Sequence, residues 1–553
     1  MKYFTTGAKS ALIDKISIEE VGMPQMVLME RASLGVAGAA AEFIKDKKQK
    51  ILTVVEGGNN GGDGVAAARI LKERGFNADI FYIGGIKRTS EAFLEQIKIA
   101  ENCGVKIYKA SDDYSLKSLL AGYDIVIDGI FGVGLSREIG GVQAEAINII
   151  NDAKEERQND LAVISIDIPS GVSADNGELL GVAVKADVTV TFGFTKVGML
   201  FGKGREYSGK IILKDIGFPA CAVEKTAPEY YGLDIDDIKK ILPVRKDDSN
   251  KGNFGRLLIV AGNDSIAGAA VIAGQAAFKA GAGLVKIFTH KDNRNIIGAA
   301  LPEALLDVYE YNSDSEELSD GTNHSAGKCS GKITSPGGEQ SGEIISSTDI
   351  ESLVKWATAI AMGPGLGTNE KSKYLLKAVL KAAYENDKPV VMDADAINII
   401  SEDRSILKNL RFEEKKWIIT PHMLEMARLI KTEDENAKDA LGRIFKDRFE
   451  VAKYVSNEYN IISVLKDART VVSDGSSRCF INTNGNSGMS KGGSGDSLTG
   501  IIGALLAEGM KPQDAARAGV FIHGAAGDIA ALKCGRTSMT VTDLNGVIDM
   551  IKR

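Results

Sequence analysis

The chain has 553 residues, which is enough for about three or four domains of average size or two large ones. Hydrophobic residues make up 44% and charged residues 25%, which is typical of a folded globular protein and excludes a mostly disordered chain or a disulfide scaffold. The net charge of −7 argues against a protein whose main surface binds nucleic acid or anionic lipid. The 61 glycines exceed the usual share, so we expect many tight turns and close approaches of the backbone to a ligand.

Cysteine usage and the apolar segments bear on the compartment. The 5 cysteines are far apart and form no C-x-x-C motif, which predicts free thiols in a reducing environment. The N-terminal sequence lacks the apolar core of a signal peptide, and no apolar run reaches the roughly 18 residues of a membrane-spanning helix. We therefore predict a cytoplasmic protein with no membrane and no nucleic-acid partner.

The first elements alternate in the manner of a parallel, doubly wound α/β sheet. A helix is expected from Pro24 to about Lys45, with Met26, Leu28, Met29, Leu34 and Val36 among its apolar positions, and it should cover the sheet. Amphipathic stretches then separate short β-branched runs, which predict strands at 50–55, 78–84, 105–108, 123–128 and 161–167.

The chain becomes charged and irregular between about Phe218 and Lys251, where we place the domain boundary. A second α/β alternation follows, with strands expected at 255–262, 282–289, 357–363, 388–393, 416–420 and 460–465, then helices over Gly495–Glu508 and Pro512–Lys533. Residues 313–347 hold nine Ser and six Gly in 35 positions, which predicts a solvated surface insert or flap. The sequence thus predicts two α/β domains, spanning residues 1–217 and 226–553.

The most informative motif of the first half is GGNNGGDG, from Gly57 to Gly64, between an expected strand and an expected helix. A Gly-rich turn there presents backbone N–H groups and a helix N-terminus to an anion. The amides of Asn59 and Asn60 and the carboxylate of Asp63 suit ribose hydroxyls, an amide or a hard cation. The alternative is an ordinary polar turn.

Two further polar motifs follow expected strands, DGIFGVGLSRE at 128–138 and SIDIPSG at 165–171. Asp128 and Asp167 each end an apolar run, where a carboxylate either bonds to the local loop or belongs to a site. Because ligands of an open α/β sheet gather at the carboxyl ends of its strands, three such motifs favour a site.

These three motifs, in this order, resemble the NAD(P)H-hydrate epimerase family over about residues 1–215. The resemblance implies a Rossmann-like fold, interconversion of the R and S forms of hydrated nicotinamide cofactors, and a bound potassium ion. It implies that Asp167 is the acid/base and that potassium is held by Asn60, Asp128 and Ser170. The hydrate site would comprise Asn59, Asn60, Gly61, Gly62, Asp63, Gly132, Val133, Gly134, Leu135, Ser136, Arg137, Glu138 and Asp167. Epimerisation requires either loss and return of water or opening of the ring, and both need a placed proton carrier.

In the second half, NGNSGMSKGGSGDSLTG from Asn484 to Gly500 predicts a phosphate site. Gly492, Gly493 and Gly495 leave the backbone free to form an anion nest at the start of a helix. Asp496 follows directly and holds the position of a catalytic base, the alternative being a glycine-rich helix cap with a favourable acidic residue.

The G-x-G-D pattern resembles ribokinase-like enzymes. Together with NKGNFGRLLIVAGN, AGAGLVKI, AMGPGLG, VMDADAIN and ITPHMLEMARL, it resembles the ADP/ATP-dependent NAD(P)H-hydrate dehydratase family over about residues 226–552. The resemblance implies that the hydrate contacts Ala270, Gly365, His422 and Asp496. It implies that the nucleotide contacts Lys466, Asp467, Ala468, Arg469, Thr470, Asn486, Ser487, Gly488, Met489, Ser490, Lys491, Gly492, Gly493, Ser494 and Gly495. Asp393 and Asp395 either help to hold Mg²⁺ or only close a strand.

The two resemblances together imply bifunctional repair of NADHX and NADPHX. The first domain would interconvert the epimers, and the second would dehydrate the S form with ADP, releasing AMP and phosphate. The resemblance also implies self-association. Two alternatives stay open at this point: a ribokinase-like kinase of a small alcohol or vitamin precursor with an accessory Rossmann-like domain, and a first domain that serves only as an interaction scaffold.

Overall fold

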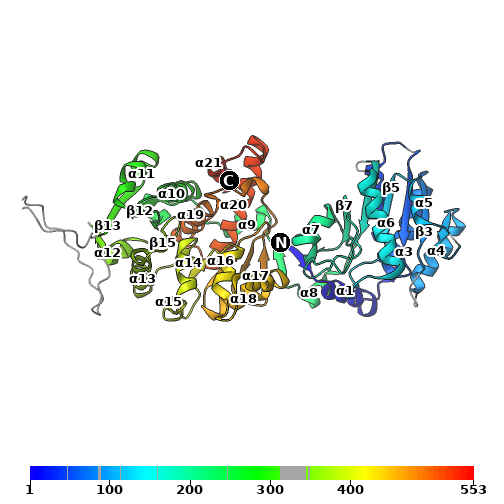
Figure 1. The fold of residues 1–553 in the computed structure, drawn as a ribbon, viewed down its shortest axis with the longest axis horizontal. Coiled ribbons are helices and arrows are strands. Elements are labelled where there is room, and N and C mark those ends of the chain that lie inside the picture. The colour runs from blue at the N-terminus through cyan, green and yellow to red at the C-terminus, as the bar shows by residue number, and fades with distance from the viewer. Residues whose placement is uncertain are drawn as a thin grey trace, which may run out of the picture. The chain divides into compact units, whose positions relative to one another are not determined.

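The computed structural model describes residues 1–46, 48–84, 89–112, 114–157, 160–245, 247–248, 250–311, 344–346 and 349–552. The chain divides into two compact units, Tyr3–Tyr231 and Met1–Lys2 with Gly232–Arg553, and each combines helices with a sheet (Figure 1). Among the described residues, no helix is both long and apolar enough to cross a bilayer.

The first unit is built on a wholly parallel sheet with strand order β4-β3-β2-β5-β6-β7-β9. Its strands are β2 (Lys50–Val55), β3 (Asn77–Tyr82), β4 (Ile107–Lys109), β5 (Ile125–Gly129), β6 (Ala162–Ile166), β7 (Val188–Phe192) and β9 (Lys210–Lys214). The chain enters at β2 in the middle and winds outward in both directions, which is the Rossmann-type order. The predicted Rossmann-like, doubly wound fold is therefore confirmed, and each strand expected in this half is present within a few residues.

The other elements of the first unit surround this sheet. They are β1 (Lys2–Thr5), which pairs in parallel with β8 (Thr195–Lys196), and the helices α1 (Gly7–Lys15), α2 (Gln25–Phe43), α3 (Asn59–Glu73), α4 (Glu91–Asn102), α5 (Leu116–Leu120), α6 (Gly141–Arg157), α7 (Gly202–Ser208) and α8 (Ala220–Thr226). A π-helical turn, Ile16–Glu20, follows α1, and β10 (Tyr230–Gly232) lies at the end of the unit.

Helix α2 covers the sheet as predicted. Leu28 and Val36 are buried in one apolar core with Ile51 of β2 and Ile164 of β6. Leu34 differs from its neighbours, since it is 44% exposed and points away from this core.

The second unit contains a larger, mostly parallel sheet, in which β14-β13-β12-β11-β15-β16-β17-β18-β19-β20 lie side by side. Its strands are β11 (Arg256–Val260), β12 (Leu284–His290), β13 (Leu305–Tyr311), β14 (Ile344–Ser346), β15 (Ala359–Met362), β16 (Val390–Met392), β17 (Trp417–Ile419), β18 (Ile462–Leu465), β19 (Val471–Ser473) and β20 (Cys479–Ile481). The pairs β13–β14, β18–β19 and β19–β20 are antiparallel, and the central strands are all parallel.

Helices pack around the second sheet. They are α9 (Ile235–Ile241), α10 (Gly268–Ala280), α11 (Arg294–Ala300), α12 (Ile350–Trp356), α13 (Glu370–Glu385), α14 (Asp395–Glu402), α15 (Ser405–Lys408), α16 (Met423–Ile430), α17 (Ala437–Lys446), α18 (Arg448–Glu458), α19 (Ser494–Ala507), α20 (Pro512–Cys534), α21 (Val541–Asn545) and α22 (Ile548–Lys552). The predicted α/β order of this half is confirmed, including the two final long helices α19 and α20. Of the predicted insert at 313–347, residues 344–346 form β14, and 312–343 and 347–348 lie outside the described residues.

Glycine fixes how closely α19 approaches α10. A Cβ atom on Gly500 would lie 2.1 Å from the carbonyl oxygen of Ala273, so a larger residue would push the two helices apart. Because α19 begins at the glycine-rich loop, this close contact helps to position the loop.

Candidate active sites

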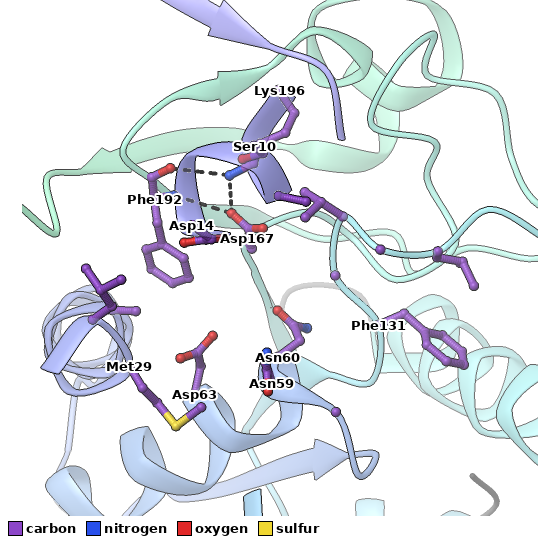
Figure 2. A pocket seen from close by; sticks show the side chains of 18 of the residues that line it. Ser10, Asp14, Met29, Asn59, Asn60, Asp63, Phe131, Asp167, Phe192 and Lys196 are labelled. Carbon is purple, nitrogen blue, oxygen red and sulfur yellow. Dashed lines mark hydrogen bonds and ion pairs between the residues drawn. The ribbon is translucent and has the colours of Figure 1, made fainter. Parts of the chain in front are cut away.

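A cavity of about 590 Å³ opens at the carboxyl ends of β2, β5 and β6 in the first unit (Figure 2). This volume is within the range of small-molecule sites. Of the residues predicted for the hydrate, its wall includes Asn59, Asn60, Asp63, Gly132, Val133, Gly134, Leu135, Ser136, Arg137 and Asp167. The three motifs therefore meet at the switch point of the sheet, where a Rossmann-type sheet binds its ligands.

Gly61, Gly62 and Glu138 of the predicted set do not line this cavity. A Cβ atom on Gly61 would lie 1.8 Å from the carbonyl oxygen of Glu56, and one on Gly62 would lie 2.7 Å from Met29 Cε. These two glycines let the start of α3 pack tightly against the strand end. Their place in the fold is to position the neighbouring Asn60 and Asp63.

Asp167 directly follows β6 and has a left-handed backbone conformation, with φ of 66°. Such a conformation is unfavourable for a residue other than glycine, so the surrounding contacts must hold it. Its N–H donates to the carbonyl oxygen of Val190 at 2.7 Å, and its Oδ1 forms an ion pair with the ammonium of Lys196. The fold thus fixes this carboxylate at the cavity wall.

The cavity also includes residues that the sequence analysis did not select. Asp14 of α1 and Lys196 of β8 lie beside Asp167, and the side chains of Met29 and Phe192 give the cavity an apolar surface (Figure 2). No motif marks Asp14, which looks like an ordinary polar position of a helix. The only signal for Lys196 is a lysine inside the otherwise apolar run VTFGFTKVGML.

Three carboxyl groups and one ammonium share this cavity. The pKa of Asp14 is raised to about 6, chiefly by burial and in part by the nearby Asp167, while Lys196 opposes the change. Burial also raises the pKa of Asp63 well above its usual value, with contributions from Asp167 and Asp14. Asp14 therefore titrates close to neutral pH, as a group that transfers protons does.

The residues predicted to hold potassium lie at the same strand ends. Ser170 donates through its hydroxyl to Asp128 Oδ1 at 2.5 Å and through its N–H to Asp128 Oδ2 at 2.9 Å. Asp128 is fully buried, burial raises its pKa, and it forms no ion pair with a described residue. The Nδ2 atom of Asn60 is buried without a hydrogen-bond partner among the described residues. The Ser165 hydroxyl and the Ile130 N–H also donate to Asp128, so both of its oxygens accept hydrogen bonds, but no positive charge of the described residues compensates the carboxylate. Because a buried carboxylate without a counter-charge is costly and the Asn60 amide can turn its oxygen inward, these residues fit a cation beside Asp128.

In the second unit, the parallel strands bring five loops to one edge. Lys466 N–H donates to the carbonyl oxygen of Pro421 at 2.8 Å, and Gly367 N–H donates to Asp395 Oδ2 at 2.8 Å. These hydrogen bonds link the loops after β15 and β16 and the loops after β17 and β18; the fifth loop is the glycine-rich one before α19.

A buried ion pair lies at the centre of this edge. Lys466 Nζ donates to Asp393 Oδ1, and the hydroxyl of Thr499 donates to Asp393 Oδ2 at 2.8 Å. Burial alone would raise the pKa of Asp393, but Lys466 and the hydrogen bonds outweigh it, so the pKa is lowered. Both carboxylate oxygens are thus occupied, which favours a strand-closing role of Asp393 over a role as Mg²⁺ ligand.

Asp496 lies in the first turn of α19, next to this pair. A Cβ atom on Gly495 would lie 3.2 Å from Asp393 Oδ2 and 3.4 Å from Lys466 Nζ, so the loop backbone rests close to both groups. Burial raises the pKa of Asp496 to about 6, and Asp393 adds to the shift while Lys466 opposes it. Asp496 is therefore ionised at neutral pH yet basic enough to accept a proton.

Several residues predicted for the nucleotide hold the shape of its loop. Asn486 donates to Asp528 Oδ1 at 2.9 Å and to the carbonyl oxygen of Gly527 at 3.0 Å. Lys491 donates to the carbonyl oxygen of Thr537 at 2.8 Å, and Arg448 donates to Asp467 Oδ2 at 2.8 Å. The backbone of Gly492 is open, with no atom within 4 Å of a Cβ placed there. The loop thus presents backbone N–H groups at the positive end of α19.

The residues predicted to contact the hydrate in this unit differ in exposure. The His422 ring is about half exposed and caps α16, where its Nδ1 accepts from the N–H of Leu424 at 3.1 Å. Gly365 has a left-handed φ of 61° in the loop after β15. Ala270 is fully buried on α10, so its side chain packs inside the unit. The role of these residues toward a ligand stays a prediction.

The fold and these sites define an α/β enzyme with two separate active sites. Residues 257–549 match the model of the NAD(P)H-hydrate dehydratase family, and residues 25–198 match the model described as YjeF-related protein N-terminus. The bifunctional NAD(P)H-hydrate repair enzyme Nnr of Thermofilum pendens is 32% identical over 96% of this chain and 93% of its own length. The Nnr of Moorella thermoacetica is 32% identical over 100% of this chain and 97% of its own length. The chain therefore belongs to the family of bifunctional NAD(P)H-hydrate repair enzymes, as the motifs predicted.

Several solved structures are also similar to this chain, and one of them covers the second unit with its ligands named. It is described as the ADP/ATP-dependent NAD(P)H-hydrate dehydratase of Bacillus subtilis co-crystallised with ATP and Mg²⁺. It is 25% identical, covers 58% of this chain and 96% of that chain, and has a TM-score of 0.43. The full-length relatives support the repair function over the two alternatives, since each is described as a bifunctional NAD(P)H-hydrate repair enzyme.

Proposed function

We propose that residues 1–217 epimerise NAD(P)H hydrates with Asp167 as acid/base, and that residues 226–553 dehydrate the S epimer with Asp496 as base. The observation that carries this proposal is the presence of two strand-edge sites: in the first, Asp167 forms an ion pair with Lys196, and in the second, Asp496 follows the glycine-rich loop next to the Lys466–Asp393 ion pair. The two activities belong together, because a dehydratase acting alone would leave the R epimer unrepaired.

In the first unit, epimerisation needs a group that takes a proton from, and returns it to, the hydroxyl oxygen on the ring carbon that inverts. Asp167 lies on the wall of a cavity with apolar side chains on one side and the amides of Asn59 and Asn60 on another. We infer that the apolar side chains hold the nicotinamide ring and that the amides bind its polar substituents.

In the second unit, Asp496 accepts the proton of the substrate hydroxyl as its oxygen attacks the terminal phosphorus of the nucleotide. With ADP as donor, AMP leaves. The ring nitrogen then expels the phosphate, a proton is lost from the neighbouring carbon, and the dihydronicotinamide is restored. The open glycine backbone and the N-terminus of α19 stabilise the transferring phosphoryl group.

We propose that K⁺ is held in the first unit by Asn60, Asp128 and Ser170. It would supply a fixed positive charge beside the buried Asp128 carboxylate. For Mg²⁺, the described residues contain no cluster of three or more His, Cys, Asp or Glu arranged as a metal site. We propose that Mg²⁺ enters with the nucleotide, whose phosphates and water supply most of its ligands. Self-association and a cytoplasmic location stay predictions.

The test follows the 340 nm absorbance of a mixed R and S NADH hydrate pool with the full chain, Mg²⁺, K⁺ and either ADP or ATP. Recovery of the whole pool, faster than spontaneous epimerisation, is expected for the unaltered enzyme. Asp167→Ala should stop at the S fraction, and Asp496→Ala should recover nothing. Full recovery by Asp167→Ala, or turnover by Asp496→Ala, would contradict the assignment of that residue.

A further inference from the structure

Lys196 is a buried lysine whose hydrogen-bonding capacity is fully used. Its side chain is 2% exposed. Its ammonium donates to Asp167 Oδ1, to the hydroxyl of Thr191 at 3.0 Å and to the carbonyl oxygen of Phe192 at 3.3 Å. Three N–H groups thus meet three acceptors, so Lys196 has no donor left for a substrate. Its effect on the reaction must pass through Asp167.

The contacts of Asp167 fall on one of its two oxygens. Oδ1 accepts from Lys196, from the hydroxyl of Thr191 at 3.3 Å and from the N–H of Phe192 at 3.4 Å. Among the described residues, none donates to Oδ2. One oxygen therefore anchors the carboxylate to the fold, and the other is left to take a proton from a molecule in the cavity.

Asp14 is the carboxyl group next to this anchored one. It comes from α1, a different element, and both side chains lie on the wall of the same cavity (Figure 2). The charge of Asp167 acts directly on Asp14, which shows that the two are close. No described residue forms an ion pair or a hydrogen bond with the Asp14 carboxyl group, whereas Asp167 has the only lysine of this wall.

We propose that Lys196 is a positioning residue that holds the Asp167 carboxylate in place, and that Asp14 is the second catalytic residue of epimerisation, the proton donor. This inference rests on the proposed function of the first unit. The substrate carries its hydroxyl oxygen and its ring nitrogen on the same carbon. One carboxyl group, Asp167, can accept the proton of the hydroxyl group, and the neighbouring one, Asp14, can donate a proton to the nitrogen.

The reaction then balances without any other reactant. Asp167 Oδ2 takes the hydroxyl proton, the oxygen forms a carbonyl group, the bond from carbon to ring nitrogen breaks, and the nitrogen takes the proton of Asp14. After rotation of the aldehyde, Asp14 removes that proton, the nitrogen attacks the other face of the carbonyl group, and the oxygen regains its proton from Asp167. Both carboxyl groups end each turnover as they began.

The charges around Asp14 support this division of roles. Inside the cavity it faces Asp167, Lys196 and, from α3, Asp63. Glu20, in the π-helical turn after α1, and Lys225, on α8, form an ion pair at the surface. With a pKa of about 6, Asp14 is mostly ionised at pH 7 but keeps a protonated fraction, so it can give a proton to the ring nitrogen.

The first experiment compares Asp14→Asn with Glu19→Gln, an exposed acidic residue five positions further along the chain. Epimerisation of R-NADH hydrate is measured with the full chain, and dehydration of pure S hydrate by the same preparation reports that the protein is folded. We expect Asp14→Asn to lower kcat of epimerisation about 100-fold or more with KM changed less than about threefold. Glu19→Gln should match the unaltered enzyme. Epimerisation by Asp14→Asn at the unaltered rate would overturn the role of Asp14.

The second experiment tests Lys196 through the pH dependence of kcat/KM. Without the ammonium, the buried Asp167 should bind its proton more tightly, so Lys196→Met should move the acidic limb of the profile upward by about one unit or more. Thr191→Val, which keeps the lysine but removes a shared hydrogen bond, should move it less in the same direction. An unmoved limb in both variants would overturn the positioning role. If the unaltered enzyme and Asp167→Ala epimerise equally, the proposed function itself fails, and this inference with it.

Discussion

The ion pair between Lys466 and Asp393 offers a direct test of how the second unit is held together. Asp393 is 1% exposed, so its charge depends on the lysine and on two hydrogen bonds for compensation. In Lys466→Met, the Thr499 hydroxyl at 2.8 Å and the Ala394 N–H at 2.9 Å would remain, but the counter-charge would be gone. Removing one partner of a buried pair costs about 3–5 kcal/mol of unfolding free energy.

The pH dependence of this loss follows from the direction of the pKa shift. The pKa of Asp393 is lowered in the folded enzyme, so the pair stabilises the fold above the unfolded value of about 3.9 and stops doing so as pH falls through the lower folded value. In Lys466→Met, burial would instead raise the pKa of Asp393. The difference between the two proteins should therefore be greatest at neutral pH and shrink below about pH 4.

Tryptophan fluorescence measures this unit selectively, because both tryptophans of the chain, Trp356 and Trp417, lie in it. Urea unfolding should show a lower midpoint for Lys466→Met, and adding Asp393→Asn should recover much of the loss. Lys377→Met, which breaks an exposed pair with Asp403, is the matched control and should cost at most about 1 kcal/mol. A midpoint for Lys466→Met equal to that of the control would refute the reasoning.

Three further outcomes are expected. Asp496→Asn should lower kcat of dehydration about 10²–10⁴-fold with little change in nucleotide affinity. The unaltered enzyme should lose dehydratase activity as pH falls through about 6, because the base must be ionised, and a flat pH–rate profile between about 5 and 7 would contradict this. Gly500→Ala should destabilise the second unit by about 1–3 kcal/mol, as measured by urea unfolding. The control Gly442→Ala, in a helix with open space around the residue, should be neutral or slightly stabilising. Equal urea midpoints for the two variants would show that α10 and α19 separate freely. Replacing K⁺ with choline should slow epimerisation and leave dehydration of the S hydrate unchanged, as measured at 340 nm; the same epimerisation rate in both salts would argue against a cation beside Asp128.

The sequence by itself determined the order of elements and the location of the motifs. Strand runs such as KILTVV and LAVISID are apolar because both faces of a parallel sheet are covered, and the glycine-rich turns that follow them mark where the chain leaves the sheet. These local signals were enough to predict two α/β units and to select Asp167 and Asp496. They also indicated the family before the fold was known.

Only the tertiary structure decided which residues work together. Asp14 and Lys196 carry no motif, and they reach Asp167 because α1 and β8 come back to the end of β6, a juxtaposition that depends on contacts distant in the sequence. Gly61 and Gly62, predicted as ligand residues, pack against Glu56 and Met29 and lie outside the cavity wall, which could not be read from their neighbours in the chain; their contact with a ligand stays a prediction. For Asp393, the sequence left open whether it binds Mg²⁺ or only closes a strand. In the structure, Lys466, which directly follows β18, forms an ion pair with its carboxylate. The order of the strands in the sheet decides which charged side chains lie next to a carboxyl group, and these neighbours in turn shift the pKa of that group.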